Sequence, residues 1–338
     1  MKNFYKAVLI AIVFLIFLGL KYPLATMLSL KKISDYPVLR LDFYGTNPFL
    51  PKNAKELKRM IKMFYPSATK RRNDIYCSLI ASKSNNGTIY GRNFDWYKAV
   101  PVVVVSHAIE GKRYASISLT DGVYLSVKGD CGLMDKINAA GAYISPFDGM
   151  NEKGLFISIA LVKQEKVPQD SKKETISSVL MVRKILDKAA TVKEAIDIVN
   201  SYNIDFFPGP HVHFLIGDAN GDGAIVEFTS KGVKVIEKKD PVFATNFTFY
   251  DKAEDADLDS LCWRYKTIDE FFKQNEKADF NSMLSLLKSV AQIGDKAFVT
   301  KWGEKLTTQW SAVYMPKGLL KVCFGGDYNK VFTFKIEK

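Results

Sequence analysis

The order of short strand patterns and longer helical patterns is the feature that most constrains the fold of this chain. Apolar or alternating runs predict β-strands at 88–93, 102–107, 114–119, 155–162, 212–217, 224–229, 309–314, 318–324 and 331–336. Helical patterns separate these strands into three groups and lie at 174–189, from Thr191 onward, at 260–273 and at 281–292. This order predicts an α+β fold in which helix layers cover β-sheets.

The composition permits one large domain and argues against a nucleic-acid partner. Of the 338 residues, 47% are hydrophobic, which is enough to bury a sizeable core. The net charge of +12 would suit an anionic partner, but the lysines are spread along the chain. The densest basic run, at 70–72, is followed at once by Asn73 and Asp74 and has no interleaved aromatic residues. We therefore predict no nucleic-acid binding.

The first residues have the pattern of an export signal. Lys2 and Lys6 precede an unbroken apolar run at 7–20. This run is shorter than the about 20 residues that span a bilayer comfortably, which favours a cleaved signal peptide. The stretch Leu24-Ala25-Thr26 is only a weak cleavage site, so an uncleaved anchor and membrane association through 7–20 stay open. We predict a signal peptide or membrane anchor at 1–25 and an extracytoplasmic protein, either secreted or membrane-anchored.

The character of the sequence changes at Cys77. Between residues 26 and 76 there is one good helical pattern, at 54–64, with Asn53 as its N-cap. Strand patterns dominate from Cys77 onward. We therefore predict a leader or propeptide-like segment at 26–76 and the main domain at 77–338. The four cysteines form no CxxC motif, which argues against a zinc ribbon; they are Cys77, Cys131, Cys262 and Cys323.

Cys77 stands at the head of a predicted β-hairpin that carries other reactive groups. A turn at Asn85-Asn86-Gly87 returns the chain as a second strand, which contains Arg92 and Asp95. Because a hairpin brings its two ends together, both side chains are expected to approach the Cys77 thiol. A guanidinium group there favours the thiolate, and a carboxylate can hold an amine. The pattern indicates a cysteine nucleophile.

This hairpin resembles the choloylglycine hydrolase family and its relatives: penicillin V acylases, N-acylethanolamine acid amidase, acid ceramidase and the acyl-CoA:6-aminopenicillanate acyltransferases. Their shared pattern is a cysteine, a turn and then Gly-Arg-Asn-x-Asp, which here is residues 91–95. Further matches follow in the same order and with similar spacing at 148–155, 212–218, 244–246 and 262–265. The joint occurrence of these segments makes the resemblance specific, and it covers nearly everything from Cys77 onward.

The resemblance implies a four-layer αββα sandwich of the N-terminal-nucleophile hydrolase type, with 77–338 as the catalytic domain. Cys77 would become the first residue of the mature chain by cleavage of the Tyr76–Cys77 bond. The thiol itself can attack the preceding carbonyl, and the basic residues 70–72 offer a second route by an external protease. Cleavage of the Tyr76–Cys77 bond would free the α-amine of Cys77, which titrates near about 7.7 to 8.0 and can act as a general base.

The resemblance also assigns roles to individual residues. Asp95 would orient the amine, and Arg92 would stabilise the thiolate. Asn246 would donate a hydrogen bond to the tetrahedral oxyanion, with Arg264 supporting the group. The sequence departs from the family at Leu161, where bile salt hydrolases and penicillin V acylases have asparagine or tyrosine. A backbone N–H would then replace that donor, and the more apolar substrate-binding pocket favours a lipid-like acyl group.

Two histidines offer a competing mechanism. His211 and His213 alternate on one predicted strand and so face the same side, which would suit a metal pair or a dyad of Cys77 with His213. A third imidazole could come only from His107, and no local cysteine-protease signature surrounds Cys77. Histidines satisfied by their neighbours are therefore favoured, and neither a metal nor a cofactor is predicted.

The predicted reaction is cleavage of a small-molecule linear N-acyl amide through a thioester acyl-enzyme. An acyltransferase would use the same acyl-enzyme with another acceptor in place of water, and the sequence leaves both open. An exported binding protein that kept the fold but lost the chemistry is disfavoured, because all the residues that the resemblance requires are present: Cys77, Arg92, Asp95, Asn246 and Arg264.

Overall fold

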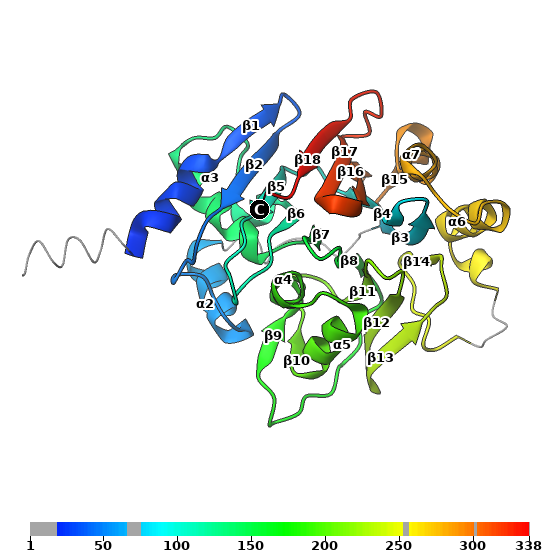
Figure 1. The fold of residues 1–338 in the computed structure, drawn as a ribbon, viewed down its shortest axis with the longest axis horizontal. Coiled ribbons are helices and arrows are strands. Elements are labelled where there is room, and N and C mark those ends of the chain that lie inside the picture. Colours follow the sequence, from blue (N-terminus) through cyan, green and yellow to red (C-terminus); the bar gives the residue numbers. More distant parts are fainter. Residues whose placement is uncertain (1–18, 66–75, 253–256, 301–302, 338) are drawn as a thin grey trace, which may run out of the picture.

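The structure is a computed structural model that describes residues 19–65, 76–252, 257–300 and 303–337. Two β-sheets face each other, and helices lie on their outer sides (Figure 1). The predicted export segment at 7–20 falls almost wholly outside the described residues, as does the basic run at 70–72. Within the described ranges, no helix combines the length and the hydropathy needed to cross a membrane.

The larger sheet has nine strands in the order β1-β2-β5-β6-β7-β8-β11-β12-β13. Their bounds are Lys31–Ser34 (β1), Val38–Phe43 (β2), Pro101–Ser106 (β5), Ser116–Asp121 (β6), Asp148–Asn151 (β7), Phe156–Leu161 (β8), Val212–Gly217 (β11), Gly223–Thr229 (β12) and Gly232–Glu237 (β13). Only β2 and β5 pair in parallel among these strands. The hairpin predicted at 212–217 and 224–229 is confirmed as β11 and β12.

The smaller sheet has seven strands in the order β14-β3-β4-β16-β17-β18, with β15 paired to β16. Their bounds are Tyr76–Ser84 (β3), Gly87–Trp96 (β4), Val242–Ala244 (β14), Phe298–Val299 (β15), Lys305–Met315 (β16), Leu319–Phe324 (β17) and Phe332–Lys335 (β18). The predicted hairpin headed by Cys77 is confirmed as β3 and β4, with Cys77 opposite Phe94 and Tyr76 opposite Asp95.

Two helix layers close the sandwich. Helices α4 (Ser178–Lys188) and α5 (Val192–Asn200) pack on the larger sheet, whereas α6 (Trp263–Gln274) and α7 (Phe280–Ser289) pack on the smaller one (Figure 1). Further elements include α2 (Ala54–Phe64), α3 (Leu133–Ala139), several short 3-10 helices and a parallel pair, β9 (Thr175–Ser177) and β10 (Asn203–Asp205). The helix predicted at 174–189 thus begins as a short strand, and the helix predicted at 281–292 ends at Ser289.

The segment at 26–65 is built into the larger sheet. The helix predicted there is confirmed as α2, and the Asn53 side chain caps it by accepting a hydrogen bond from the Glu56 N–H. The structure adds β1 and β2, which the sequence analysis did not predict. Alternate residues of β2 are buried under the helix layer, namely Leu39, Leu41 and Phe43. This alternation is an ordinary strand signal. The leader segment therefore supplies part of the sheet.

Candidate active site

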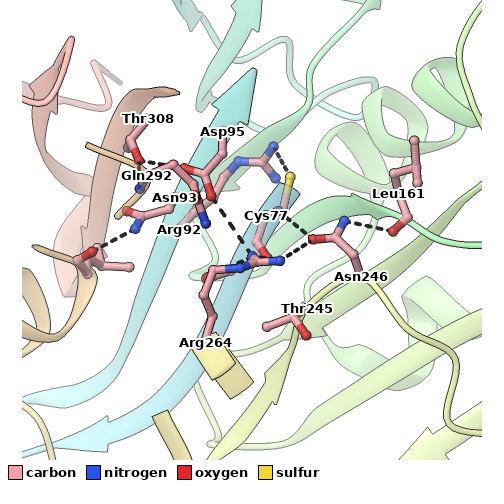
Figure 2. Close-up of polar contacts among 12 residues, drawn as sticks. Cys77, Arg92, Asn93, Asp95, Leu161, Thr245, Asn246, Arg264, Gln292 and Thr308 are labelled. Atoms are coloured by element: carbon pink, nitrogen blue, oxygen red, sulfur yellow. Dashed lines mark hydrogen bonds and ion pairs between the residues drawn. The ribbon is translucent and has the colours of Figure 1, made fainter. Parts of the chain in front are cut away.

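Cys77 lies at the start of β3 with its side chain between the two sheets (Figure 2). Because Cys77 is opposite Phe94 and strand side chains alternate, Arg92 of β4 lies on the same face of the sheet as the thiol. The Arg92 Nη2 is 3.7 Å from the Cys77 Sγ. The sequence prediction that the hairpin brings a guanidinium group to the thiol is confirmed.

The Arg92 side chain is fully buried, and the opposite sheet holds it in place. Its Nε lies 2.8 Å from the Asp148 Oδ2, and neither side chain is exposed to solvent. Its Nη1 donates hydrogen bonds to the Ser158 hydroxyl and, at 2.7 Å, to the Ile159 carbonyl. These contacts leave Nη2 facing the Cys77 sulfur. The guanidinium group is therefore fixed before any substrate binds.

Asp148 is a site residue that the sequence analysis did not single out. It begins β7, and besides the contact with Arg92 it accepts hydrogen bonds from the Trp310 Nε1 at 3.2 Å and from the Tyr314 hydroxyl. A buried carboxylate needs such donors, because burial without them is strongly unfavourable. The signal that could have found it was its place in the segment at 148–155, which the family resemblance had marked.

Burial has the largest effect on the pKa of the Cys77 thiol. It raises the pKa of the Cys77 thiol to about 11, and the negative charge of Asp95 adds to this effect. The positive charges of Arg92 and Arg264 act in the opposite direction. In the uncut chain the thiol is therefore protonated at neutral pH, and it needs a base to become a nucleophile.

Asp95 lies on the other face of β4 from Arg92, toward the helix layer. Its Oδ1 accepts a hydrogen bond of 2.6 Å from the Thr308 hydroxyl. Its Oδ2 is buried without a hydrogen-bond donor among the described residues and lies 4.0 Å from the Arg264 Nη1. Burial raises the pKa of Asp95 to about 6, opposed first by the charge of Arg264 and then by the Thr308 hydrogen bond. A buried acceptor oxygen without a hydrogen-bond donor is unusual. The Oδ2 of Asp95 can therefore accept a hydrogen bond from a further group.

Asn246 accepts a hydrogen bond from the backbone nitrogen of Cys77. Its Oδ1 accepts hydrogen bonds from the Cys77 N–H at 2.7 Å and from the Arg264 Nη2 at 2.9 Å. Its Nδ2 donates to the Leu161 carbonyl at 2.8 Å (Figure 2). The first two partners can only donate and the third can only accept, so the orientation of the amide is unambiguous. One of the two Nδ2 hydrogens is thereby used.

Arg264, in the first turn of α6, connects the other site residues. Its Nη1 donates hydrogen bonds to the Cys77 carbonyl and, at 3.3 Å, to the Ser78 hydroxyl. Its guanidinium group also lies 5.5 Å from the centre of the Tyr76 ring. The side chain is only 2% exposed. Arg264 therefore lies inside the candidate site, although it belongs to a helix on the outer layer.

The two strand histidines are bonded to their neighbours. The His213 Nδ1 lies 3.4 Å from the Glu227 Oε1, and its Nε2 lies 2.9 Å from the Thr245 carbonyl. The His211 Nε2 lies 2.7 Å from the Phe228 carbonyl. Because both ring nitrogens of His213 face other partners, the arrangement does not favour a dyad with Cys77.

One group of potential metal ligands comes together within the described ranges, and it lies outside the Cys77 site. It consists of Asp42, His107 and Glu337. The Arg40 Nη2 lies 2.7 Å from the Asp42 Oδ1 and 2.5 Å from the Glu337 Oε1. One guanidinium group therefore already bridges the two carboxylates and offsets one of their two negative charges.

An apolar pocket opens onto the Cys77 thiol. Arg92 is the only charged side chain among the described residues that line it. One wall comes from β8 and β11, including Leu161 as the sequence predicts. A second wall comes from the leader segment, which the sequence analysis did not foresee; its lining residues there are Leu57, Met60, Ile61 and Tyr65. Such a surface suits a hydrocarbon chain better than a polar group.

Comparison with solved structures identifies the class of fold. The chain resembles a mutant of the conjugated bile acid hydrolase from Clostridium perfringens with a TM-score of 0.56 and 16% sequence identity, over 77% of this chain and 92% of that chain. It resembles penicillin V acylase from Agrobacterium tumefaciens with a TM-score of 0.55 and 19% identity, over 77% of this chain and 86% of that chain. At these identities the likeness shows the fold.

Comparison with family models identifies the family. Residues 82–328 match the model described as acyl-coenzyme A:6-aminopenicillanic acid acyl-transferase, and the chain belongs to this family. The resemblance inferred from the sequence, which included these acyltransferases, is confirmed. No curated protein sequence matches the chain. The family match begins five residues after Cys77, so the case for Cys77 as the nucleophile stands on the geometry around it.

Proposed function

We propose that the protein is an N-terminal-nucleophile hydrolase that cleaves linear N-acyl amides through a thioester on Cys77. The observation that carries the proposal is that the sulfur and the nitrogen of this residue have separate, prearranged partners. Arg92 lies at the sulfur, and Asn246 accepts a hydrogen bond from the nitrogen. An ordinary cysteine nucleophile has no use for its own backbone nitrogen. A cysteine whose amine is the general base requires that nitrogen to be held.

Activation would proceed by attack of the thiol on the preceding peptide bond. The Cys77 sulfur forms a thioester with the Tyr76 carbonyl carbon, the C–N bond breaks, and the nitrogen takes up the proton that the thiol releases. Water then hydrolyses the thioester and frees the new carboxyl terminus of Tyr76. Asp95 lies opposite Tyr76 in the strand register, and its Oδ2 has no hydrogen-bond donor among the described residues. The released amine would supply that donor.

In the mature enzyme the amine would take the proton of the Cys77 thiol, and the thiolate would attack the acyl carbon of the substrate. The Asn246 Nδ2 and the backbone N–H of Leu161 would donate hydrogen bonds to the resulting oxyanion. The amine then gives its proton to the departing nitrogen, and water releases the acid from the thioester. Arg92 stabilises the thiolate at the start of each cycle, which offsets part of the effect of burial.

The leader segment would stay bound after the cut, because it is paired into the larger sheet. It also forms part of the pocket that the mature enzyme would use. Strand β2 pairs with β5 along its length, and the Tyr36 hydroxyl donates a hydrogen bond of 2.8 Å to the Gln309 side chain. Helix α2 forms one wall of the pocket. We propose that the two pieces form one noncovalent enzyme and that the acyl chain of the substrate lies between them.

The apolar pocket predicts a preference for acyl chains of medium to long length. Each methylene buried should raise kcat/KM roughly fourfold until the pocket is full, because it contributes about 0.8 kcal/mol. We would assay N-acyl amides from acetyl to palmitoyl, with bile conjugates and penicillin V included, by mass spectrometry of the products. Met60→Trp should fill the part of the pocket next to the leader segment and shift the preference to shorter acyl chains. Lys62→Ala, on the exposed side of α2, is the matched control. A preference for acetyl over decanoyl would refute the acyl-chain assignment.

Acyl transfer is the second candidate, and the family to which the chain belongs favours it. A thioester on Cys77 can be captured by an amine or thiol instead of water. The same mass assay would decide this when an amine acceptor is added, because transfer gives a new N-acyl product whereas hydrolysis gives only the free acid.

We further propose that the enzyme acts outside the cytoplasm. The basis is the sequence pattern of Lys2, Lys6 and the apolar run at 7–20. Fractionation of the native cell should recover the protein in the secreted or membrane fraction. Full-length protein in the soluble cytoplasmic fraction would contradict this proposal.

A further inference from the structure

Strand β16 carries an irregularity next to the candidate site. Thr308 is opposite Asp95 in the pairing of β16 with β4, but Trp310 is opposite Phe94, so Gln309 is an extra residue in β16. Such β-bulges change the direction of neighbouring side chains and are frequent beside active sites. Here the bulge adjoins the residue that contacts Asp95.

The Gln309 side chain fixes the bulge in place. It is 3% exposed. Its Oε1 accepts hydrogen bonds of 2.8 Å from the Ala99 N–H and from the Tyr36 hydroxyl, and its Nε2 donates to the Trp96 carbonyl at 3.2 Å. A buried amide with this many partners is rigid, because each hydrogen bond restricts it in a different direction. The position of Thr308 is therefore set by the sheet.

The neighbours of the Thr308 hydroxyl determine which way its hydrogen points. The Gln292 backbone N–H donates to the Thr308 Oγ1 at 2.8 Å, so one lone pair of this oxygen is occupied. The hydroxyl hydrogen is left for Asp95, whose Oδ1 lies 2.6 Å away (Figure 2). A donor aimed at a carboxyl group favours its charged form.

On this geometry, we propose that Thr308 is a positioning residue that keeps Asp95 ionised and leaves its second oxygen free for the amine of Cys77. The inference rests on the proposed function of Asp95. Without the hydroxyl, the buried carboxyl group would lose its only hydrogen-bond donor among the described residues and could rotate or take up a proton.

Other charged and titratable groups act on Asp95 from the neighbouring elements. Arg264 of α6 and Arg92 of β4 favour the carboxylate. Cys77 of β3 and Tyr328, which follows β17, feel the negative charge of Asp95 in turn. Among the described residues, none of these groups donates a hydrogen bond to the Asp95 carboxyl group, and the Arg264 Nη1 lies 4.0 Å from its Oδ2.

The first test separates the hydroxyl group of Thr308 from its methyl group. Thr308→Val keeps the shape and removes the hydroxyl, whereas Thr308→Ser keeps the hydroxyl and removes the methyl. We expect the valine variant to lower kcat about tenfold to a hundredfold, as for loss of a hydrogen bond to a charged group, with KM unchanged because Thr308 does not line the pocket. The serine variant should stay close to wild type. A serine variant that loses as much activity as the valine variant, or more, would overturn the proposal, because packing would then be the role of Thr308.

The second test does not depend on activity. In uncut Cys77→Ala protein, infrared difference spectra would follow protonation of the Asp95 carboxyl group, identified by its absence in Asp95→Asn protein. Thr308→Val should move this titration to higher pH than in the Thr308 parent, and Thr308→Ser should leave it in place. If circular dichroism shows that the Thr308→Val variant is not folded, Thr308→Ala serves as the hydroxyl-free variant.

An unchanged titration of Asp95 in the hydroxyl-free protein would refute the proposal even if the enzyme proves to be an amide hydrolase. A shifted titration in a protein without amidase activity would instead count against the proposed function alone.

Discussion

Replacement of Cys77 by alanine is expected to leave the chain uncut and to lower amide hydrolysis by roughly 10⁴-fold or more, since it removes the nucleophile. The structure gives a physical reason to expect both losses together. The thiol that would attack the substrate is the same group that would attack the Tyr76 carbonyl. Before the cut, the nitrogen of Cys77 is an amide that cannot take a proton near neutral pH, so a correctly folded precursor should be inactive.

N-terminal sequencing and intact mass of the purified protein would check this result. Active wild-type enzyme should begin at Cys77 and should carry the leader as a separate bound piece. Cys131→Ala is a suitable control, because this half-buried cysteine lies in the loop before α3 and does not line the pocket. Active protein in which Cys77 is still joined to Tyr76 would overturn the mechanism.

Replacement of Arg92 by methionine is expected to lower the free energy of unfolding by about 3 kcal/mol or more. The variant leaves Asp148 buried with hydrogen bonds from Trp310 and Tyr314 but without a positive charge beside it. The same change should raise the pKa of the Cys77 thiol further, because the positive charge of Arg92 is the strongest influence that lowers this pKa. Thiol alkylation at a given pH should therefore slow down together with catalysis.

The double variant Arg92→Met with Asp148→Asn separates the two effects. It removes the uncompensated charge, so urea unfolding should show much of the lost stability restored. It does not return a guanidinium group to the sulfur, so the pH profile of alkylation and kcat should stay as in the single variant. Recovery of activity in the double variant would show that Arg92 acts only by neutralising Asp148.

The Tyr76–Cys77 segment could be placed relative to Arg92 and Asp95 from the sequence because all four residues belong to one hairpin. A short turn sets the strand register, and the alternation of strand side chains then sets the faces. Arg92 and Asp95 are three residues apart in β4, so the same alternation places them on opposite faces, which the expectation that both side chains approach the thiol did not take into account. Arg92 lies between the sheets with the sulfur, whereas Asp95 lies toward α6 and Thr308.

The role of Asn246 needed the structure. Its segment at 244–246 was recognised by resemblance, and a hydrogen bond to the oxyanion was the expected contribution. The structure places its Oδ1 on the Cys77 nitrogen and one Nδ2 hydrogen on the Leu161 carbonyl. An amide side chain has both donors and acceptors, and only the surrounding backbone decides which of them is engaged.

By itself, the sequence determined the class of fold, the candidate nucleophile and its hairpin, because these depend on local periodicity, turn chemistry and motifs within short stretches of chain. Only the tertiary structure decided the partners that come from distant segments. Asp148 reaches Arg92 because the two sheets face each other, and Thr308 reaches Asp95 because β16 pairs with β4 through a bulge. Helix α2 reaches the pocket because β2 joins the larger sheet. Strand patterns show which faces are buried but not which strands pair across long loops, since many pairings bury the same apolar surface.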